Sequence, residues 1–124
     1  MEIKTYNGTK ANFYIQSKGL HSGRPLKNPI PNCFAVNTDI ENAFEIVYSL
    51  WIGKKFQNNI IGSVIPFIRI TETKQIVFKA LKVAKNYHKG KLKTLELMDK
   101  NIENLKRQIK LIKELQYSTA KSLN

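Results

Sequence analysis

The stretch LELMDKNIENLKRQIKLI, residues 95–112, decides the expected fold. Its apolar residues recur at steps of three, four, three, four and three, which is the spacing of a coiled-coil seam. The seam residues are Leu95, Met98, Ile102, Leu105, Ile109 and Ile112. About two and a half heptads are too few for an independent coiled coil in water, so the seam must close on the rest of the domain or on another chain. We therefore expect a homodimer, or docking onto partner helices, through this segment.

The helix that carries the seam is predicted to run from about residue 80 to about residue 121. Gly90 is its weak point, since glycine costs about 1 kcal/mol relative to alanine inside a helix. A continuous rod and a helix that bends back at Gly90 are both compatible with the sequence. Lysines before the seam step by three or four residues and would share one helical face on such a rod. These lysines are Lys79, Lys82, Lys85, Lys89 and Lys93.

The charge balance agrees with a polyanionic partner. The 124 residues include 21 Lys and Arg against 9 Asp and Glu, which gives a formal net charge of +12. Residues 1–38 carry +4, residues 39–78 are neutral and residues 79–124 carry +8. Lysine–phosphate contacts would release counterions and give affinity that falls steeply with salt. The alternative is a solvated lysine-rich face with no ligand. We expect double-stranded DNA as the partner, contacted through its phosphates by the lysine face.

The first 38 residues are predicted to form a strand, a long loop and a second strand. Residues 11–16 and 33–36 are the strand candidates, and the glycines and prolines of residues 17–32 exclude a helix between them. Polar side chains of this loop are the candidates for reaching base edges, with Arg24 as the best single choice. The alternative is a plain surface loop. The loop candidates are Ser17, Lys18, His21, Ser22, Arg24, Lys27 and Asn28.

The middle of the chain predicts one amphipathic helix followed by short strands. Thr38 and Glu41 fit a capping box at the start of this helix. Its apolar stripe would consist of Ile40, Phe44, Val47 and Trp51. Strands are then expected over residues 62–68 and 75–78, with a turn at 71–74. The predicted fold class is α+β: a small curved β-sheet with one packed amphipathic helix over residues 1–78, then a long C-terminal coiled-coil-type helix over residues 79–124.

Catalytic chemistry finds little support in this sequence. Cys33 and His21 are the only nucleophile and base that could pair, and an unpaired cysteine is usually an inert, buried hydrophobe. No cluster of metal ligands and no glycine-rich phosphate loop is present. Aromatic residues such as Trp51 fit core positions better than a base-stacking platform. We therefore expect a protein that is not an enzyme, with no cofactor and no metal.

Membrane association is also disfavoured by the sequence. The longest nearly charge-free apolar run, residues 60–68, is much shorter than the roughly 20 residues that a membrane span needs. A lysine-rich amphipathic helix could lie on anionic lipid, but residues 79–124 contain no Trp or Phe to anchor it. The N-terminus lacks the apolar region of a signal peptide. The expected location is the cytoplasm, with no membrane partner.

Four predicted segments follow one another in an order that is known from another family. They are the helix at 44–51, the Gly-Ser segment at 62–68, the polar turn at 70–76 and the long helix at 79–124. This order resembles the C-terminal part of the target recognition domain, with its spacer helix, in type I restriction–modification specificity subunits. The resemblance implies sequence-specific DNA binding in the service of a methyltransferase. Residues 17–26 also resemble small uncharacterised proteins of bacterial mobile elements, which implies no activity.

Two functions follow as hypotheses. The first is a non-enzymatic DNA-binding protein, a minimal restriction-type target recognition domain that dimerises through the seam. Its phosphate contacts would come from the lysine face together with Lys18, Arg24 and Lys27. The second is a helix-mediated interaction or structural accessory module of a phage or mobile element, in which the charge is incidental.

Overall fold

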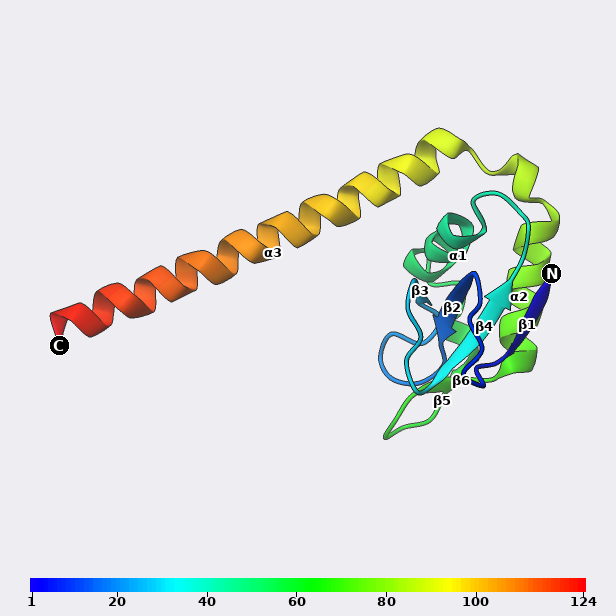
Figure 1. The fold of residues 1–124 in the computed structure, drawn as a ribbon, viewed down its shortest axis with the longest axis horizontal. Coiled ribbons are helices and arrows are strands. Elements are labelled where there is room, and N and C mark those ends of the chain that lie inside the picture. The colour runs from blue at the N-terminus through cyan, green and yellow to red at the C-terminus, as the bar shows by residue number, and fades with distance from the viewer. The chain divides into compact units, whose positions relative to one another are not determined.

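The computed structural model describes residues 1–124, and the chain divides into two compact units. Unit 1 comprises residues 1–88 and unit 2 comprises residues 89–124. Strands and two helices make up unit 1, and one long helix makes up unit 2 (Figure 1). The predicted α+β class, with a small antiparallel sheet and a long C-terminal helix, is confirmed.

A four-stranded antiparallel sheet forms the centre of unit 1, in the order β1-β4-β2-β3. The strands are β1 (Glu2–Thr5), β2 (Phe13–Gln16), β3 (Pro25–Leu26) and β4 (Cys33–Asn37). The two predicted strands correspond to β2 and β4, the central pair, in which Phe13 lies opposite Val36. Strand β1 was not predicted, because this edge strand buries only Ile3, which has a charged residue on each side. Likewise, β3 is a two-residue strand inside the predicted loop.

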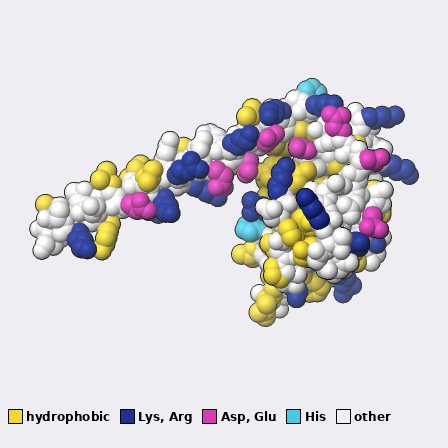
Figure 2. Space-filling model, in the orientation of Figure 1, with side chains coloured by type: hydrophobic (Ala, Val, Ile, Leu, Met, Phe, Trp, Pro, Cys, Tyr) yellow, Lys and Arg dark blue, Asp and Glu magenta, His cyan; other side chains and the backbone are white.

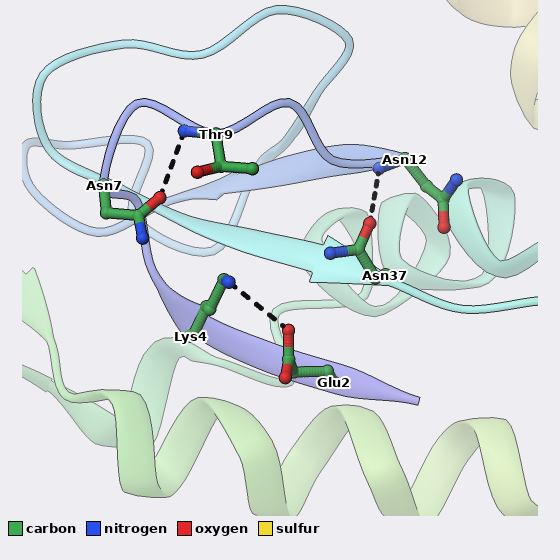
Figure 3. A network of polar contacts seen from close by, with 6 residues as sticks. All are labelled: Glu2, Lys4, Asn7, Thr9, Asn12 and Asn37. Carbon is green, nitrogen blue, oxygen red and sulfur yellow. Dashed lines mark hydrogen bonds and ion pairs between the residues drawn. The ribbon is translucent and has the colours of Figure 1, made fainter.

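Polar contacts at the exposed ends of β1, β2 and β4 fix the connection between the first two strands (Figure 3). Asn37 Oδ1 accepts a hydrogen bond from the Asn12 N–H at 3.2 Å, and Asn12 Oδ1 accepts one from the Thr38 N–H at 2.7 Å. Asn7 Oδ1 accepts from the Thr9 N–H at 3.1 Å within the turn. These side chains satisfy backbone donors and so serve a structural purpose.

A second, two-stranded sheet pairs β5 (Ile60–Ile61) with β6 (Phe67–Ile68). The strand predicted over residues 62–68 is therefore wrong for residues 62–66, which form the hairpin tip. Gly62 has a φ of +100°, and a side chain there would lie 2.6 Å from the carbonyl oxygen of Ile65. The tight reversal that glycine permits at this position ends the strand.

Helix α1 (Ala43–Ile52) begins later than the predicted capping box. Asn42 precedes it in the left-handed conformation with a φ of 62°. Thr38 Oγ1 accepts a hydrogen bond from the Ile40 N–H at 3.1 Å, which closes a local turn before the helix begins. The capping box of Thr38 and Glu41 is therefore wrong. The buried face of α1 is also rotated from the predicted stripe, and it consists of Ala43, Ile46, Val47 and Leu50.

Helix α2 (Ile70–Lys82) replaces both the predicted turn at 71–74 and the predicted strand at 75–78. Thr73, Val77, Ala80 and Leu81 are buried, at the spacing of one helical face. Three β-prone residues at 76–78 suggested a strand, but the longer helical period decided the structure. Local β-propensity is a weak determinant when a longer segment can bury one helical face.

The predicted continuous helix over residues 80–121 is also wrong, because it breaks between α2 and the next helix. Residues 84–86 form a 3₁₀ turn, η2 (Ala84–Asn86), and α3 (Lys89–Leu123) then runs for 35 residues. The break follows Val83, and the intervening Asn86, Tyr87 and His88 are also weak helix formers. Gly90, the expected weak point, lies inside α3.

The core of unit 1 lies between one face of the four-stranded sheet and helices α1 and α2. Its most deeply buried side chains are Ile15, Val36, Ile46, Val47, Phe56 and Val77, all at most 1% exposed. Gly23 has a φ of +96° and lies against the Phe56 ring. The other face of the sheet carries a smaller cluster around Tyr14, Cys33 and Ala35.

Candidate interaction surfaces

The predicted lysine face is divided among three elements. Lys79 and Lys82 belong to α2, Lys85 to η2, and Lys89 and Lys93 to α3. All five are exposed, but they do not follow one helix axis, because the backbone departs from the α-helix over residues 83–88. The prediction of a single helical face for these residues is therefore wrong. Whether each lysine contacts phosphate stays a prediction.

The predicted base-reading loop folds into a compact hairpin that packs on α1. Gly23 N–H donates to the Gln16 carbonyl at 2.8 Å, and Gln16 N–H donates to the Arg24 carbonyl at 2.9 Å. Ser22 is buried, and its Oγ donates to the Gly19 carbonyl at 2.7 Å, so Ser22 is part of the turn. Lys18 pairs with β6 through a bridge to Phe67. Of the other candidates, His21, Lys27 and Asn28 are exposed.

Two of three neighbouring aromatic side chains of α1 have a cation from the loop of residues 17–32 over their rings. We call Phe44, Tyr48 and Trp51 the aromatic strip; all three are half-buried. The Arg24 guanidinium lies 5.4 Å from the centre of the Trp51 ring, and Lys27 Nζ lies 4.3 Å from the centre of the Phe44 ring. Both contacts are within the range of cation–π attraction. Arg24 and Lys27 are thus held in place beside the strip.

His21 joins the same group from the hairpin. Its imidazole packs edge-on against Trp51 with ring centres 5.9 Å apart, and Tyr48 lies 6.1 Å from Trp51. Trp51 was assigned to the core by the sequence, but half-burial leaves part of its ring at the surface. The spacing of Phe44, Tyr48 and Trp51, four and then three residues, is the signal that could have indicated a shared helical face.

An open cavity of about 330 Å³ adjoins the aromatic strip and was not foreseen. Phe56 and Trp51 contribute aromatic surface to its wall, Leu20 is aliphatic, and Lys54 brings an ammonium group. The remaining lining residues are Ser22, Ile52, Gln57 and Ile60. Because the Ser22 hydroxyl is already bonded to Gly19, the cavity is mainly apolar with one cation.

Long stretches of unit 1 contain no acidic residue, although Asp39, Glu41 and Glu45 lie before and at the start of α1. Residues 3–38 and 46–71 have no Asp or Glu, while they contain eight Lys and Arg. These bases are Lys4, Lys10, Lys18, Arg24, Lys27, Lys54, Lys55 and Arg69. The β2–β3 hairpin and the region after α1 therefore lie in a locally positive field. Although residues 79–124 carry most of the net charge, this second concentration of cations lies in unit 1.

Cys33 and His21 lie in different environments. Cys33 is buried, as predicted, in the cluster around Tyr14, and its Sγ donates to the Ile30 carbonyl at 3.1 Å. His21 is exposed and packs on Trp51. The two side chains therefore do not form a nucleophile–base pair. No group of three or more His, Cys, Asp and Glu residues is arranged to bind a metal ion. No helix has both the length and the apolar character that crossing a membrane requires.

The seam predicted on the C-terminal helix lies in the middle of α3. Its residues from Met98 to Ile112 are exposed, between 48% for Ile102 and Leu105 and 58% for Ile112. Leu95 is half-buried, and Leu92 is the only buried residue of α3. Figure 2 shows hydrophobic side chains at the surface along α3, interspersed with Lys and Arg. The apolar side of this helix thus has no covering layer over most of its length.

Ion pairs along α3 support the helix from its polar side. Glu96 lies 3.4 Å from Lys100 and 3.6 Å from Lys93, and Glu103 lies 3.7 Å from Lys106. The Lys100 and Lys93 ammonium groups lower the pKa of Glu96 below its ordinary value. All these groups are exposed, so each pair contributes little to stability.

The sequence matches DUF6943, a family of unknown function, over residues 3–122. This match covers nearly the whole chain, and the protein therefore belongs to the DUF6943 family. No curated protein and no solved structure shows significant similarity to it. The resemblance to restriction specificity subunits stays a prediction.

Proposed function

We propose that this DUF6943 protein is a helix-mediated self-assembly module, in which α3 binds α3 of another copy through its seam. The single observation that supports this proposal is the exposed row of apolar side chains at coiled-coil spacing in a 35-residue helix. A helix of this kind gains most of its stability from tertiary or quaternary packing and little from its own propensities. The seam therefore accounts for both the length of α3 and its pattern.

The energetics favour pairing because the seam residues are still about half exposed. Burying apolar surface gains roughly 25 cal/mol per Å², and the five exposed residues from Met98 to Ile112 could all enter one interface. Polar residues occupy most of the remaining surface of α3, so the interface would have a polar rim. Association through this helix would leave the core of unit 1 unchanged.

Sedimentation equilibrium of the intact chain tests this function directly. We expect an assembly larger than a monomer at micromolar concentration. Leu105→Glu places a charge in the seam and should convert the assembly to monomers, while Asn104→Glu, on the neighbouring polar position, should not. A monomeric wild-type chain whose α3 keeps its helicity would overturn the proposal, since the seam would then need no partner.

Duplex DNA binding is the second candidate function, and the acid-free segments of unit 1 favour it. Lys4 pairs with Glu2 at 3.6 Å, and the other seven cations of these segments create a field that attracts phosphate. Arg24 and Lys27 are held against aromatic rings, which lowers the entropy cost of placing them on a ligand. In this function Lys18, Arg24 and Lys27 contact phosphates, and assembly through α3 brings two basic units together.

A salt titration of binding to a random DNA duplex tests the second function. Binding should weaken steeply with rising salt, with a slope close to the number of phosphates contacted. The Arg24→Ala and Lys27→Ala double variant should bind several-fold more weakly at every salt concentration. Lys121→Ala is the control for the loss of a cation elsewhere. Absence of a mobility shift at low salt would exclude this function and leave helix-mediated assembly unaffected.

A further inference from the structure

We infer that α3 pairs with α3 of a second copy in antiparallel orientation and in one register, an inference that rests on the proposed function. In this register Ile102 of one copy lies opposite Leu105 of the other. Met98 then lies opposite Ile109, and Leu95 lies opposite Ile112. The two-fold axis passes between Ile102 and Leu105, so the interface is isologous.

The spacing of the seam makes this pairing possible. The steps of three, four, three, four and three are the same when read from either end. An antiparallel copy can therefore match all six seam residues, with an apolar side chain opposite an apolar side chain in every layer. Burial of complete apolar layers is the main driving force for association.

The residues beside the seam supply the charge complementarity. Asp99 and Lys106 each directly follow a seam residue, Met98 and Leu105. In an antiparallel pair, the residue after Met98 in one copy faces the residue after Leu105 in the other. Asp99 of one copy therefore faces Lys106 of the other. The symmetry produces this opposite-charge contact twice. Lys106 also lies 3.7 Å from Glu103 of its own helix, an exposed pair that is too weak to prevent the new contact.

Shifting the antiparallel pair by one heptad makes the pairing poorer in both directions. One shift places Lys106 against Lys106 and Met98 against Gln116, although Asp99 then faces Lys113. The opposite shift places Asp99 against Asp99 and Ile109 against Lys91. Each shifted register thus combines like charges with a polar residue in an apolar layer, and such combinations are how coiled coils exclude wrong alignments.

A parallel pair is less favoured by the same flanking residues. The isoleucines Ile102 and Ile109 with Leu105 would pack acceptably in parallel, so the apolar layers alone do not select an orientation. In a parallel pair, however, Lys106 faces Asn101, Lys113 faces Gln108 and Asp99 faces Thr94. No ion pair forms across that interface. The flanking charges therefore favour the antiparallel orientation.

Disulfide formation between single-cysteine variants distinguishes the orientations. Cys33→Ala is introduced first, to remove the native thiol, and Leu95→Cys and Ile112→Cys are then made separately in this background. An equimolar mixture should give a disulfide between residue 95 and residue 112 on mild oxidation, because antiparallel pairing brings these two within disulfide distance. Each variant alone should stay reduced. Disulfides within each variant alone, and none between residue 95 and residue 112 in the mixture, would show a parallel pair and overturn the inference.

A charge exchange gives a second test that does not depend on oxidation. Asp99→Lys creates two Lys–Lys contacts in the antiparallel pair and should weaken dimerisation on the order of tenfold. Adding Lys106→Asp should restore the affinity, since residues 99 and 106 then exchange roles. Asp99→Lys with Lys113→Asp has the same net charge and should not restore it. Equal effects of the two double variants would overturn the inference.

The two proposals fail in distinguishable ways. A chain that sediments as a monomer contradicts helix-mediated self-assembly itself. A dimer with residue 95 linked to residue 95 supports assembly and contradicts the antiparallel register. Association only with a different protein's helix, and never between copies, would also contradict the inference.

Discussion

Helices α2 and α3 have similar amphipathic patterns but very different surroundings. Four residues of α2, a helix of 13 residues, are buried within unit 1, including Val77 at 0% exposure. Only Leu92 is buried in the 35 residues of α3. The period of apolar residues shows that a helix has an apolar face that must be buried. It does not show whether that face is buried by the same chain or by another one. The predictions below concern this difference, beginning with the largest expected effect.

Dilution should produce the largest difference in helicity between α2 and α3. Below the dissociation constant of the dimer, α3 loses its covering layer and should lose much of its helicity, because most of the stability of a helix comes from the packing of its apolar face. Circular dichroism at 222 nm over a wide concentration range measures this loss. The near-ultraviolet signal of Trp51, which belongs to unit 1, should stay constant. Unchanged helicity at nanomolar concentration would mean that α3 is stable without a partner.

Truncating a buried side chain should affect only unit 1. Ile46 is 1% exposed, and Ile46→Ala should lower the free energy of unfolding of unit 1 by about 2–5 kcal/mol. Leu97→Ala, at 53% exposure in α3, is the matched control and should leave this free energy unchanged within about 0.5 kcal/mol. Urea unfolding followed by Trp51 fluorescence gives both values. Equal losses of stability in the two variants would contradict the division into a packed unit 1 and an exposed α3.

Gly8 and Gly23 have the same φ, so substitutions at these two positions distinguish the cost of backbone strain from the cost of close packing inside unit 1. Gly8 and Gly23 both have a φ of +96°, but only Gly23 has a neighbour, with Phe56 2.6 Å from the added side-chain carbon. Gly8→Ala should cost about 1 kcal/mol for the left-handed backbone alone, and Gly23→Ala about 1–3 kcal/mol more, because Phe56 must move. Thermal unfolding of both variants measures the difference. A Gly23→Ala variant as stable as Gly8→Ala would mean that Phe56 shifts freely.

Acidification should have the smallest effect. The pKa of Glu96 is lowered from 4.5 by Lys100 and Lys93, so its contribution to the helix is complete above pH 4.5 and is lost as the pH falls through the lowered value. Circular dichroism of wild type should therefore show a small loss of helicity in acid that Glu96→Gln lacks. Glu114→Gln in the same helix is the control and should behave as wild type. An identical titration of Glu96→Gln and wild type would contradict this assignment.

The sequence predicted the seam, the fold class and the central strands β2 and β4, because each depends on a pattern within one segment. It failed for residues 75–78, where three β-prone residues belong to a helix whose buried face is set by its packing in unit 1. It also indicated only Gly90 as the place for a bend, although the weak helix formers around Val83 and Tyr87 provide the break. Contacts between distant segments, such as Arg24 on Trp51, could not be predicted because no local pattern encodes which surfaces meet.

The uncovered seam of α3 also bears on how long the protein survives in a cell. Proteases and chaperones act on chains that expose apolar surface and open easily. A copy without a partner would offer them a frayed, lysine-rich segment, whereas a paired copy would not. The amount of intact protein should therefore follow the amount that has assembled, and surplus copies would be removed first.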